Sequence, residues 1–173
     1  MTDEKIMIIE EDLYTASQLA DTLALNGYTV VDIVSSGESA ISIVDHVSLD
    51  LILMDIMLKG PLDGLMTATE ILSRTVLPII YLTPLVDEEL VIRSKNILPY
   101  GFLTKPVDEE KLIVTIKRAL TWHAWCQSSG EPENQKEAGN QEGVYSVIQE
   151  DRLSSIKNNK LRFPVIQPEW MAY

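Results

Sequence analysis

The sequence predicts an α/β fold in which a doubly wound sheet of five parallel strands is covered by five helices. Five short apolar segments typical of strands alternate with five segments of helical periodicity along residues 5–127. The third strand segment, LDLILMD, is a near-continuous apolar run, as is typical of a strand buried on both faces. Because parallel strands need helical crossovers, this alternation favours a parallel sheet with helices on both sides.

The first half of this region contains three predicted strands and three predicted helices. The first helix carries apolar residues at helical spacing and ends at Asn26-Gly27, a pair suited to a C-cap. Ser35 and Glu38 match a capping box, which predicts the start of the second helix. In chain order, the elements are strand 5–10, helix 13–25, strand 28–34, helix 35–46, strand 49–55 and, after the loop GPLDG, helix 64–74.

The second half contains the last two strands and helices. Asp87 is a suitable N-cap for the fourth helix, and Asp108 for the fifth. The predicted elements are strand 76–83, helix 87–96, strand 100–104 and a long helix from 108 to about 126. In sheets of this kind, functional groups gather outside the carboxyl ends of the strands, near the point where the winding direction reverses.

The composition changes abruptly after Cys126. Residues 128–143, SSGEPENQKEAGNQEG, contain one alanine and no other apolar side chain, which is typical of a flexible polar linker. Residues 144–173 regain apolar side chains, but thirty residues cannot normally build a core of their own. We therefore expect one domain over 1–127, a linker over 128–143 and a C-terminal tail over 144–173 that is no independent domain.

Charge and cysteine content exclude several function classes. The net charge of −12 argues against sequence-independent binding to nucleic acid or anionic membranes, which depends on cationic patches. The single cysteine excludes an intrachain disulfide and fits a reducing compartment. The N-terminal residues show no signal-peptide pattern, and no apolar run approaches the ~18 residues of a membrane span. We expect a soluble cytoplasmic protein without membrane insertion.

Polar residues stand at the carboxyl ends of the predicted strands. Glu10 and Glu11 follow the first strand, and Asp55 ends the third. Thr83 ends the fourth strand, and Lys105 follows the fifth. Because the first and third strands neighbour the switch point, we expect the three carboxylates to converge, which requires a counter-charge. A hard divalent cation supplies it, and Mg²⁺ suits few protein ligands with retained waters better than Ca²⁺.

This set of groups suits phosphoryl transfer, which requires in-line positioning and neutralised phosphoryl oxygens. Asp55 provides a carboxylate nucleophile, Lys105 a mobile positive charge and Thr83 a hydroxyl donor. An alternative for the acids at 10–12 is enrichment at a helix N-terminus by the helix dipole.

Residues 5–127 resemble the receiver domain of two-component response regulators, the CheY-like family. The matching stretches are IMIIEED, LDLILMDIMLKGPLDG, PIIYLT and GFLTKP, in that order. The resemblance implies a flavodoxin-like sheet of order 2-1-3-4-5. It also implies that Asp55 accepts a phosphoryl group from a histidine kinase or phosphotransfer protein, so that the protein is a phosphoacceptor rather than an enzyme acting on other substrates.

The resemblance further assigns a role to each matching position. It implies Mg²⁺ held by Glu10, Glu11, Asp55 and the backbone carbonyl of Met57. Thr83 and Lys105 would sense and bind the phosphoryl group, Phe102 would be the rotating aromatic of the switch, and the peptide bond before Pro106 would be cis.

Two positions depart from the family pattern. Glu11 stands where the family usually has aspartate, and Pro84 where it commonly has a small residue whose backbone N–H holds the phosphoryl group. Proline has no such donor, so we expect a smaller or costlier shift of Thr83 on phosphorylation.

Met57 and Leu85 are apolar, and we expect them to shield the acyl phosphate from water and slow its hydrolysis.

Three functions stay open at this point. The first is a phosphoacceptor that signals to a downstream target through protein contacts, since no helix-turn-helix module for DNA binding follows residue 127. The second is a phosphohydrolase of the haloacid-dehalogenase type, which requires an aspartate where this chain has Met57. The third is a degenerate receiver, an interaction module that is never phosphorylated.

Trp122 and Trp125 lie off the apolar stripe of the last helix and suit either packing by the tail or a homodimer or partner patch.

Overall fold

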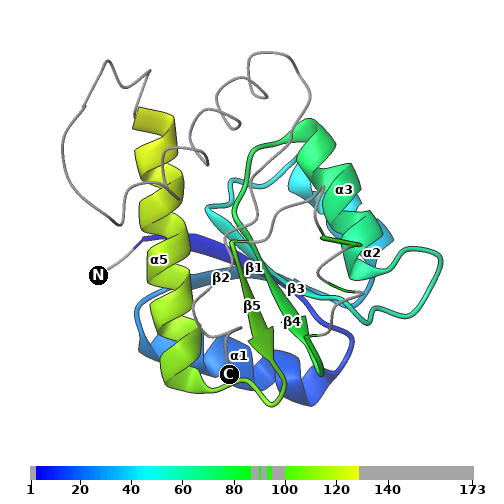
Figure 1. The fold of residues 1–173 in the computed structure, drawn as a ribbon, viewed down its shortest axis with the longest axis horizontal. Helices are drawn as coiled ribbons and strands as arrows, with labels where there is room; N and C mark the ends of the chain where they lie inside the picture. The colour runs from blue at the N-terminus through cyan, green and yellow to red at the C-terminus, as the bar shows by residue number, and fades with distance from the viewer. Residues whose placement is uncertain (1–2, 87–89, 91–92, 95–99, 129–173) are drawn as a thin grey trace, which may run out of the picture.

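The computed structural model describes residues 3–86, 90, 93–94 and 100–128. They form a parallel five-stranded sheet of order β2-β1-β3-β4-β5, which confirms the doubly wound α/β fold and its flavodoxin-like strand order (Figure 1). Helices α1 and α5 pack on one face of this sheet, and α2 and α3 on the other. The elements are β1 (Lys5–Ile9), α1 (Leu13–Leu25), β2 (Thr29–Val34), α2 (Gly37–Val44), β3 (Leu51–Asp55), α3 (Gly64–Arg74), β4 (Ile79–Thr83), β5 (Gly101–Thr104) and α5 (Glu109–Ser128).

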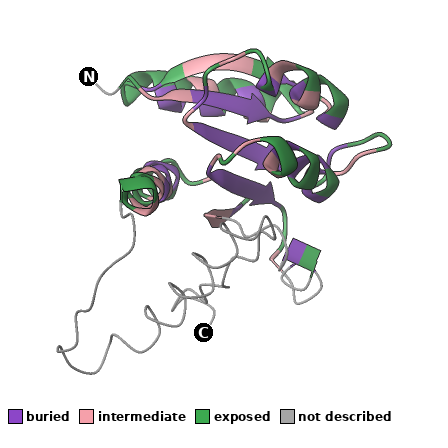
Figure 2. Cartoon of the chain, turned by 90° about the horizontal axis from the view of Figure 1, so that it is seen from above, coloured by how far each residue is buried: buried purple, intermediate pink, exposed green. Residues whose placement is uncertain are grey.

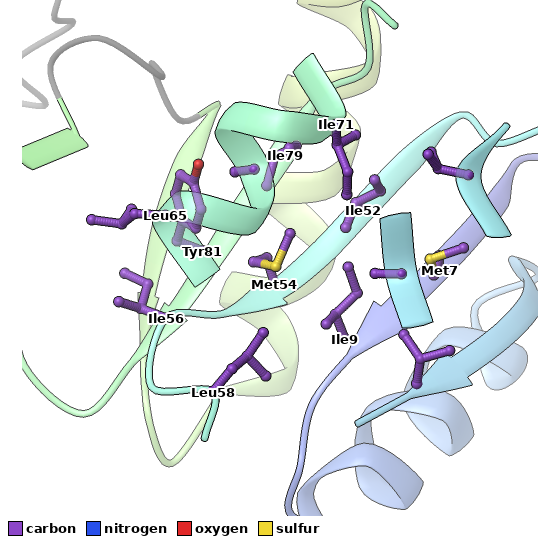
Figure 3. Packing of buried hydrophobic residues seen from close by; sticks show 14 of the residues in the cluster. Met7, Ile9, Ile52, Met54, Ile56, Leu58, Leu65, Ile71, Ile79 and Tyr81 are labelled. Atoms are coloured by element: carbon purple, nitrogen blue, oxygen red, sulfur yellow. The ribbon is translucent and has the colours of Figure 1, made fainter. Parts of the chain in front are cut away.

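The sheet has a separate hydrophobic core on each face because successive side chains of a strand point to opposite sides. In β3, for example, Met54 packs toward α2 and α3 while Leu53 packs toward α1 and α5. Figure 2 shows the central strands buried and the helices exposed along their outer sides. The first core is drawn in Figure 3, and its fully buried strand residues are Met7, Ile9, Ile52, Met54, Ile79 and Tyr81. Burial on both faces explains why β3 reads as an unbroken apolar run.

Helix α2 begins one residue later than the predicted capping box. Its N-cap is Ser36, whose side chain accepts a hydrogen bond from the Ser39 backbone N–H at 3.3 Å, so the prediction of Ser35 with Glu38 is wrong. The reason is the close approach of α2 to α3: a Cβ on Gly37 would lie 2.0 Å from Thr67 Oγ1. The glycine therefore has to occupy the first helical position, where the two helices touch.

Other element boundaries differ from the prediction by a few residues. Strand β4 begins at Ile79 rather than at residue 76, because Pro78 has no backbone N–H for a ladder. The predicted caps Asn26 and Asp108 are confirmed, since Asn26 ends α1 and Asp108 accepts from the Lys111 N–H at 2.8 Å. Helix α5 runs to Ser128 and so includes the first residue of the predicted linker.

Several predicted segments fall outside the described residues. They are most of the fourth helix, 87–96, nearly all of the linker, 128–143, and the whole tail, 144–173. The rings of Trp122 and Trp125 lie beside each other on α5, with centroids 5.1 Å apart. Over the part of the chain that the structure describes, no helix is long and apolar enough to cross a membrane.

Candidate functional site

Asp55 is the last residue of β3 and lies almost fully buried, 4% exposed. Its backbone is paired with Leu82 of β4, so the carboxylate emerges at the carboxyl edge of the sheet. One carboxylate oxygen, Oδ1, accepts a hydrogen bond from the Met57 N–H at 2.8 Å. The other, Oδ2, accepts one from Lys105 Nζ at 2.7 Å. These partners explain how an acid can end an apolar strand, since a buried carboxylate is tolerated only when it is paired.

Lys105 is the cation of the site. Its backbone N–H donates to the carbonyl of Thr83 at 2.8 Å, which extends the pairing of β4 and β5 by one residue. The peptide bond to Pro106 is cis, the isomer that the resemblance implies. Burial of the ammonium works to lower the pKa of Lys105, but its hydrogen bonds to Asp55 and Glu10 outweigh that effect and raise the pKa above 10.5.

Glu10 lies beside Asp55 on the same ammonium. Its Oε2 forms an ion pair with Lys105 Nζ at 2.5 Å, and its Oε1 accepts a hydrogen bond from the Asp12 N–H at 3.0 Å. The residue is 1% exposed, and this burial raises the pKa of the Glu10 carboxyl, against the opposing hydrogen bond from Lys105. Glu10, Asp55 and Lys105 thus form a buried acidic site, in which two carboxylates share one ammonium and negative charge is in excess.

Glu11 is turned toward a different cation. Its Oε1 accepts from Lys59 Nζ at 2.8 Å and its Oε2 from the Lys59 backbone N–H at 3.3 Å. Asp12 is the N-cap of α1 and accepts from the Thr15 N–H at 2.8 Å, so it performs the helix-terminus role that the sequence left open for these acids. The three consecutive acids therefore have three different partners.

Thr83 ends β4 and is 3% exposed. Its hydroxyl donates to the Leu85 carbonyl at 2.7 Å and accepts from the Leu85 N–H at 3.3 Å, which forms a tight turn around Pro84. A hydroxyl engaged in this way has to break its bond to the Leu85 carbonyl before it can donate to another group. The side chain of Leu85 is itself 63% exposed.

Met57 and Phe102 complete the set of predicted residues. Met57 follows Asp55 by two positions, lies at the rim of the acidic site and is 64% exposed. Phe102 on β5 stacks against Tyr81 of β4, with ring centroids 5.6 Å apart and planes at 28°. Tyr81 is fully buried, so Phe102 has a rigid neighbour on its inner side.

The donor set fits Mg²⁺ in its chemistry, although the side chains are not gathered as a complete ligand cage. Among the residues that the structure describes, no three His, Cys, Asp or Glu side chains are grouped closely enough to hold a metal ion. Asp55 and Glu10 nevertheless converge on one ammonium, and Mg²⁺ is commonly bound by one or two carboxylates with several retained waters. Glu11 would have to leave Lys59 to join them.

Two residues at the site were not predicted. Lys59 holds Glu11, and no sequence pattern pairs residues 48 positions apart in two loops. Gly64 is the first residue of α3, and a Cβ there would lie 2.1 Å from the Asp55 backbone carbonyl oxygen. The sequence did contain a signal for Gly64, because a glycine at a helix start after a strand often marks a close backbone approach.

A parallel α/β sheet with Asp55, Glu10 and Lys105 at its carboxyl edge is the arrangement of a receiver domain. The response regulator receiver domain family matches residues 6–117, well over half of the chain. The chain belongs to this family, whose members are signalling domains of two-component systems.

Known proteins agree with this assignment. The chain is 30% identical over 90 residues to the transcriptional regulatory protein PdtaR of Mycobacterium tuberculosis, a match that covers 52% of this chain and 43% of PdtaR. The matched part therefore spans less than half of that relative's length.

Solved structures give the same result. The receiver domain of a modulated diguanylate cyclase from Desulfovibrio desulfuricans G20 is 33% identical with a TM-score of 0.68, covering 72% of this chain and 98% of that one. The N-terminal domain of a response regulator/sensory box/GGDEF protein from Carboxydothermus hydrogenoformans is 34% identical with a TM-score of 0.67, covering 72% and 99%.

Proposed function

We propose that this receiver accepts a phosphoryl group on Asp55 from a histidine kinase or phosphotransfer protein, in a Mg²⁺-dependent reaction in the cytoplasm. The observation that carries the proposal is the Lys105 ammonium, which lies 2.7 Å from Asp55 and 2.5 Å from Glu10. A buried nucleophile with a cation already aimed at it is preorganised for the charge that develops on the phosphoryl oxygens.

The proposed reaction forms one bond and breaks one. A carboxylate oxygen of Asp55 attacks phosphorus, the bond from phosphorus to the donor nitrogen breaks, and that nitrogen keeps the electron pair. Bound Mg²⁺ would neutralise charge on the phosphoryl oxygens, held by Asp55 and Glu10, with the Met57 carbonyl and Glu11 as the further ligands. Lys105 stays beside the new acyl phosphate and pairs with one of its oxygens, and the Thr83 hydroxyl turns from Leu85 to donate to another.

We propose that the signal passes on through protein contacts rather than through direct binding to DNA. The net charge of −12 supports this, because a DNA-binding surface neutralises phosphates with clustered lysine and arginine. A degenerate receiver that acts without phosphorylation is the second candidate. Two observations favour it. Glu11 already forms an ion pair with Lys59, and the Thr83 hydroxyl already donates a hydrogen bond to the Leu85 carbonyl.

The test is incubation with acetyl phosphate and Mg²⁺, read by intact mass. We expect the wild-type protein to gain the mass of one phosphoryl group and Asp55→Asn to gain none. Asp21→Asn on the exposed side of α1 is the matched control and should be phosphorylated like the wild type. No adduct on the wild type would support the degenerate receiver, and turnover of phosphate esters would support the hydrolase.

Pro84→Ala is expected to enlarge the response of the segment that follows β4 to phosphorylation. The substitution restores a backbone N–H that can bind the phosphoryl group and relieves the restriction on the Thr83 backbone. One added charge-assisted hydrogen bond is worth about 1.5–3 kcal/mol in favour of the switched state. Amide chemical shifts of residues 83–90, recorded with and without the phosphoryl analogue beryllofluoride, measure this response. Equal shift changes in the two proteins would contradict the expected role of Pro84.

Met57→Asn is expected to shorten the lifetime of the phosphorylated protein. Replacing an apolar side chain at the rim with a polar one lets water approach the acyl phosphate. Loss of about 0.7 kcal/mol of the hydrolysis barrier corresponds to a roughly threefold shorter half-life. The half-life is measured by the decay of the phosphorylated mass after acetyl phosphate is removed, with Met66→Asn, on the exposed side of α3, as the control. An unchanged or longer half-life for Met57→Asn would rule out shielding by Met57.

A further inference from the structure

The loop between β3 and α3 is attached to Glu11, beside the acidic site, through Lys59. This residue makes two contacts with one carboxylate, from Nζ to Glu11 Oε1 at 2.8 Å and from the backbone N–H to Oε2 at 3.3 Å. The two ends of the loop are fixed as well, by the Met57 N–H on Asp55 at 2.8 Å and by the Gly64 N–H on the Ile56 carbonyl at 3.0 Å. Between these ends, Leu58 is buried in the first core, and Lys59 ties the exposed part of the loop to Glu11.

The Lys59 contact is well placed to be reversible. The Lys59 side chain is 85% exposed and that of Glu11 is 33% exposed, so both can be rehydrated when they separate. Exposed ion pairs of this kind are weak, and they exchange readily with competing ions. Gly60 follows Lys59 with φ +124°, a backbone conformation that glycine adopts without strain, and no atom lies within 4 Å of the place where a Cβ would stand. Space is therefore open around Gly60, next to Lys59.

We propose that Lys59 is a positioning residue that holds Glu11 in the metal-free protein and releases it when a divalent cation binds beside Asp55. This inference rests on the proposed function, because it concerns cation binding at the same acidic site. Lys59 thus sets the affinity for the cation, and the exchange couples cation binding to a movement of the β3–α3 loop.

The formal charges of the acidic site and of the neighbouring Glu11–Lys59 pair support the exchange. With all groups ionised, Glu10, Glu11 and Asp55 carry three negative charges, and Lys59 and Lys105 carry two positive ones. Withdrawal of Lys59 leaves a net charge of −2, which one divalent cation neutralises. Lys105 cannot withdraw in the same way, because it is only 20% exposed and is bound to both buried carboxylates.

The first experiment measures Mg²⁺ affinity directly, without phosphorylation. Amide chemical shifts of residues 10–12 and 55–60 are followed during titration with MgCl₂. We expect Lys59→Met to bind Mg²⁺ about fivefold more tightly than the wild type, the limit that a weak exposed ion pair allows. Lys59→Arg keeps the pair and should bind like the wild type. Lys117→Met, which removes an exposed lysine from α5, should also leave the affinity unchanged.

The second experiment separates the Glu11 contact from the general effect of a positive charge. Glu11→Gln is combined with Lys59→Met, and the titration is repeated in all four proteins. If Lys59 acts through Glu11, the fivefold gain disappears in the Glu11→Gln background. An equal gain in both backgrounds would overturn the proposal, since Lys59 would then act by its charge alone. Unchanged affinity in Lys59→Met would overturn it too.

The loop gives an independent readout. In the wild type, Mg²⁺ should shift the amide signals of Lys59 and Gly60, because the Lys59 N–H loses its carboxylate acceptor. In Glu11→Gln this loop response should be small even where Mg²⁺ still binds. Phosphorylation by acetyl phosphate tests the proposed function separately. A protein that is phosphorylated and binds Mg²⁺ with no effect of Lys59 retains that function and loses this inference. Absence of Mg²⁺ binding in every variant removes both.

Discussion

Lys105→Met is expected to destabilise the metal-free protein by about 3 kcal/mol at pH 7, because it leaves two buried carboxylates without their shared cation. Glu10 is 1% exposed and Asp55 4%, so neither carboxylate can recover its hydration without unfolding the edge of the sheet. Methionine matches the length of the lysine stem, which limits the effect to the missing charge and its hydrogen bonds. Urea denaturation gives the free energy of unfolding, and Lys117→Met on α5 serves as an exposed control, with an expected change within about 0.5 kcal/mol.

The pH dependence of the free energy of unfolding supplies a sharper test of the interaction between Lys105 and Glu10. In the folded wild type the pKa of Lys105 is raised, so its stabilisation is present below the unfolded pKa of 10.5 and is lost as the pH rises through the folded value. In Lys105→Met that contribution is absent at every pH. The pKa of Glu10 is already raised by burial, and it rises further without its ammonium partner.

A carboxyl group with a raised pKa binds more protons in the folded than in the unfolded state, so folding is favoured as the pH falls. We therefore expect the stability deficit of Lys105→Met to shrink between pH 8 and pH 5, and Mg²⁺ to reduce it at pH 7. A deficit that stays constant across this pH range would show that the lost energy is packing rather than charge.

The sequence was sufficient to predict the fold and the central pair of the site. Asp55 stands out because it ends an apolar run that is buried on both faces, and Lys105 because it is fixed between a strand and a proline. Both lie at the carboxyl ends of parallel strands, and the topology brings such ends together. Chain order therefore carried nearly all the information needed to place this pair.

The rest of the site depends on which partner in another loop each side chain contacts. Glu11 has the same charge and the same place in the sequence whether it faces a cation beside Asp55 or pairs with Lys59. The outcome is decided by the conformation of the β3–α3 loop, and that loop has no periodic pattern. The start of α2 was misplaced for a related reason, since contact between Gly37 and Thr67 of α3 selected Ser36 as the cap. Both are tertiary contacts between segments far apart in the sequence.

Gly64→Ala is expected to reduce both stability and phosphorylation, because α3 begins directly on the backbone of β3, which ends at the proposed phosphoacceptor Asp55. A Cβ at this position would lie 2.1 Å from the Asp55 carbonyl oxygen and 2.8 Å from Ile56 Cα. Both neighbours are backbone atoms and cannot rotate away, so the strand end or the helix must shift. Overpacking of this kind costs about 1–3 kcal/mol. Displacement of a reacting group by about 1 Å lowers rates by up to ~100-fold.

Gly37→Ala is the matched control for the expected loss of phosphorylation rate in Gly64→Ala. It also creates a close contact, 2.0 Å from Thr67 Oγ1, but that contact lies between α2 and α3 and involves a rotatable side chain. We expect Gly37→Ala to lower the free energy of unfolding while the rate of phosphorylation per folded molecule stays at the wild-type value. Gly64→Ala should lower that rate at least tenfold, with acetyl phosphate as the donor and intact mass as the readout. Equal rates in the two variants would mean that the position of Asp55 does not depend on the start of α3, and that the loop alone orients its carboxylate.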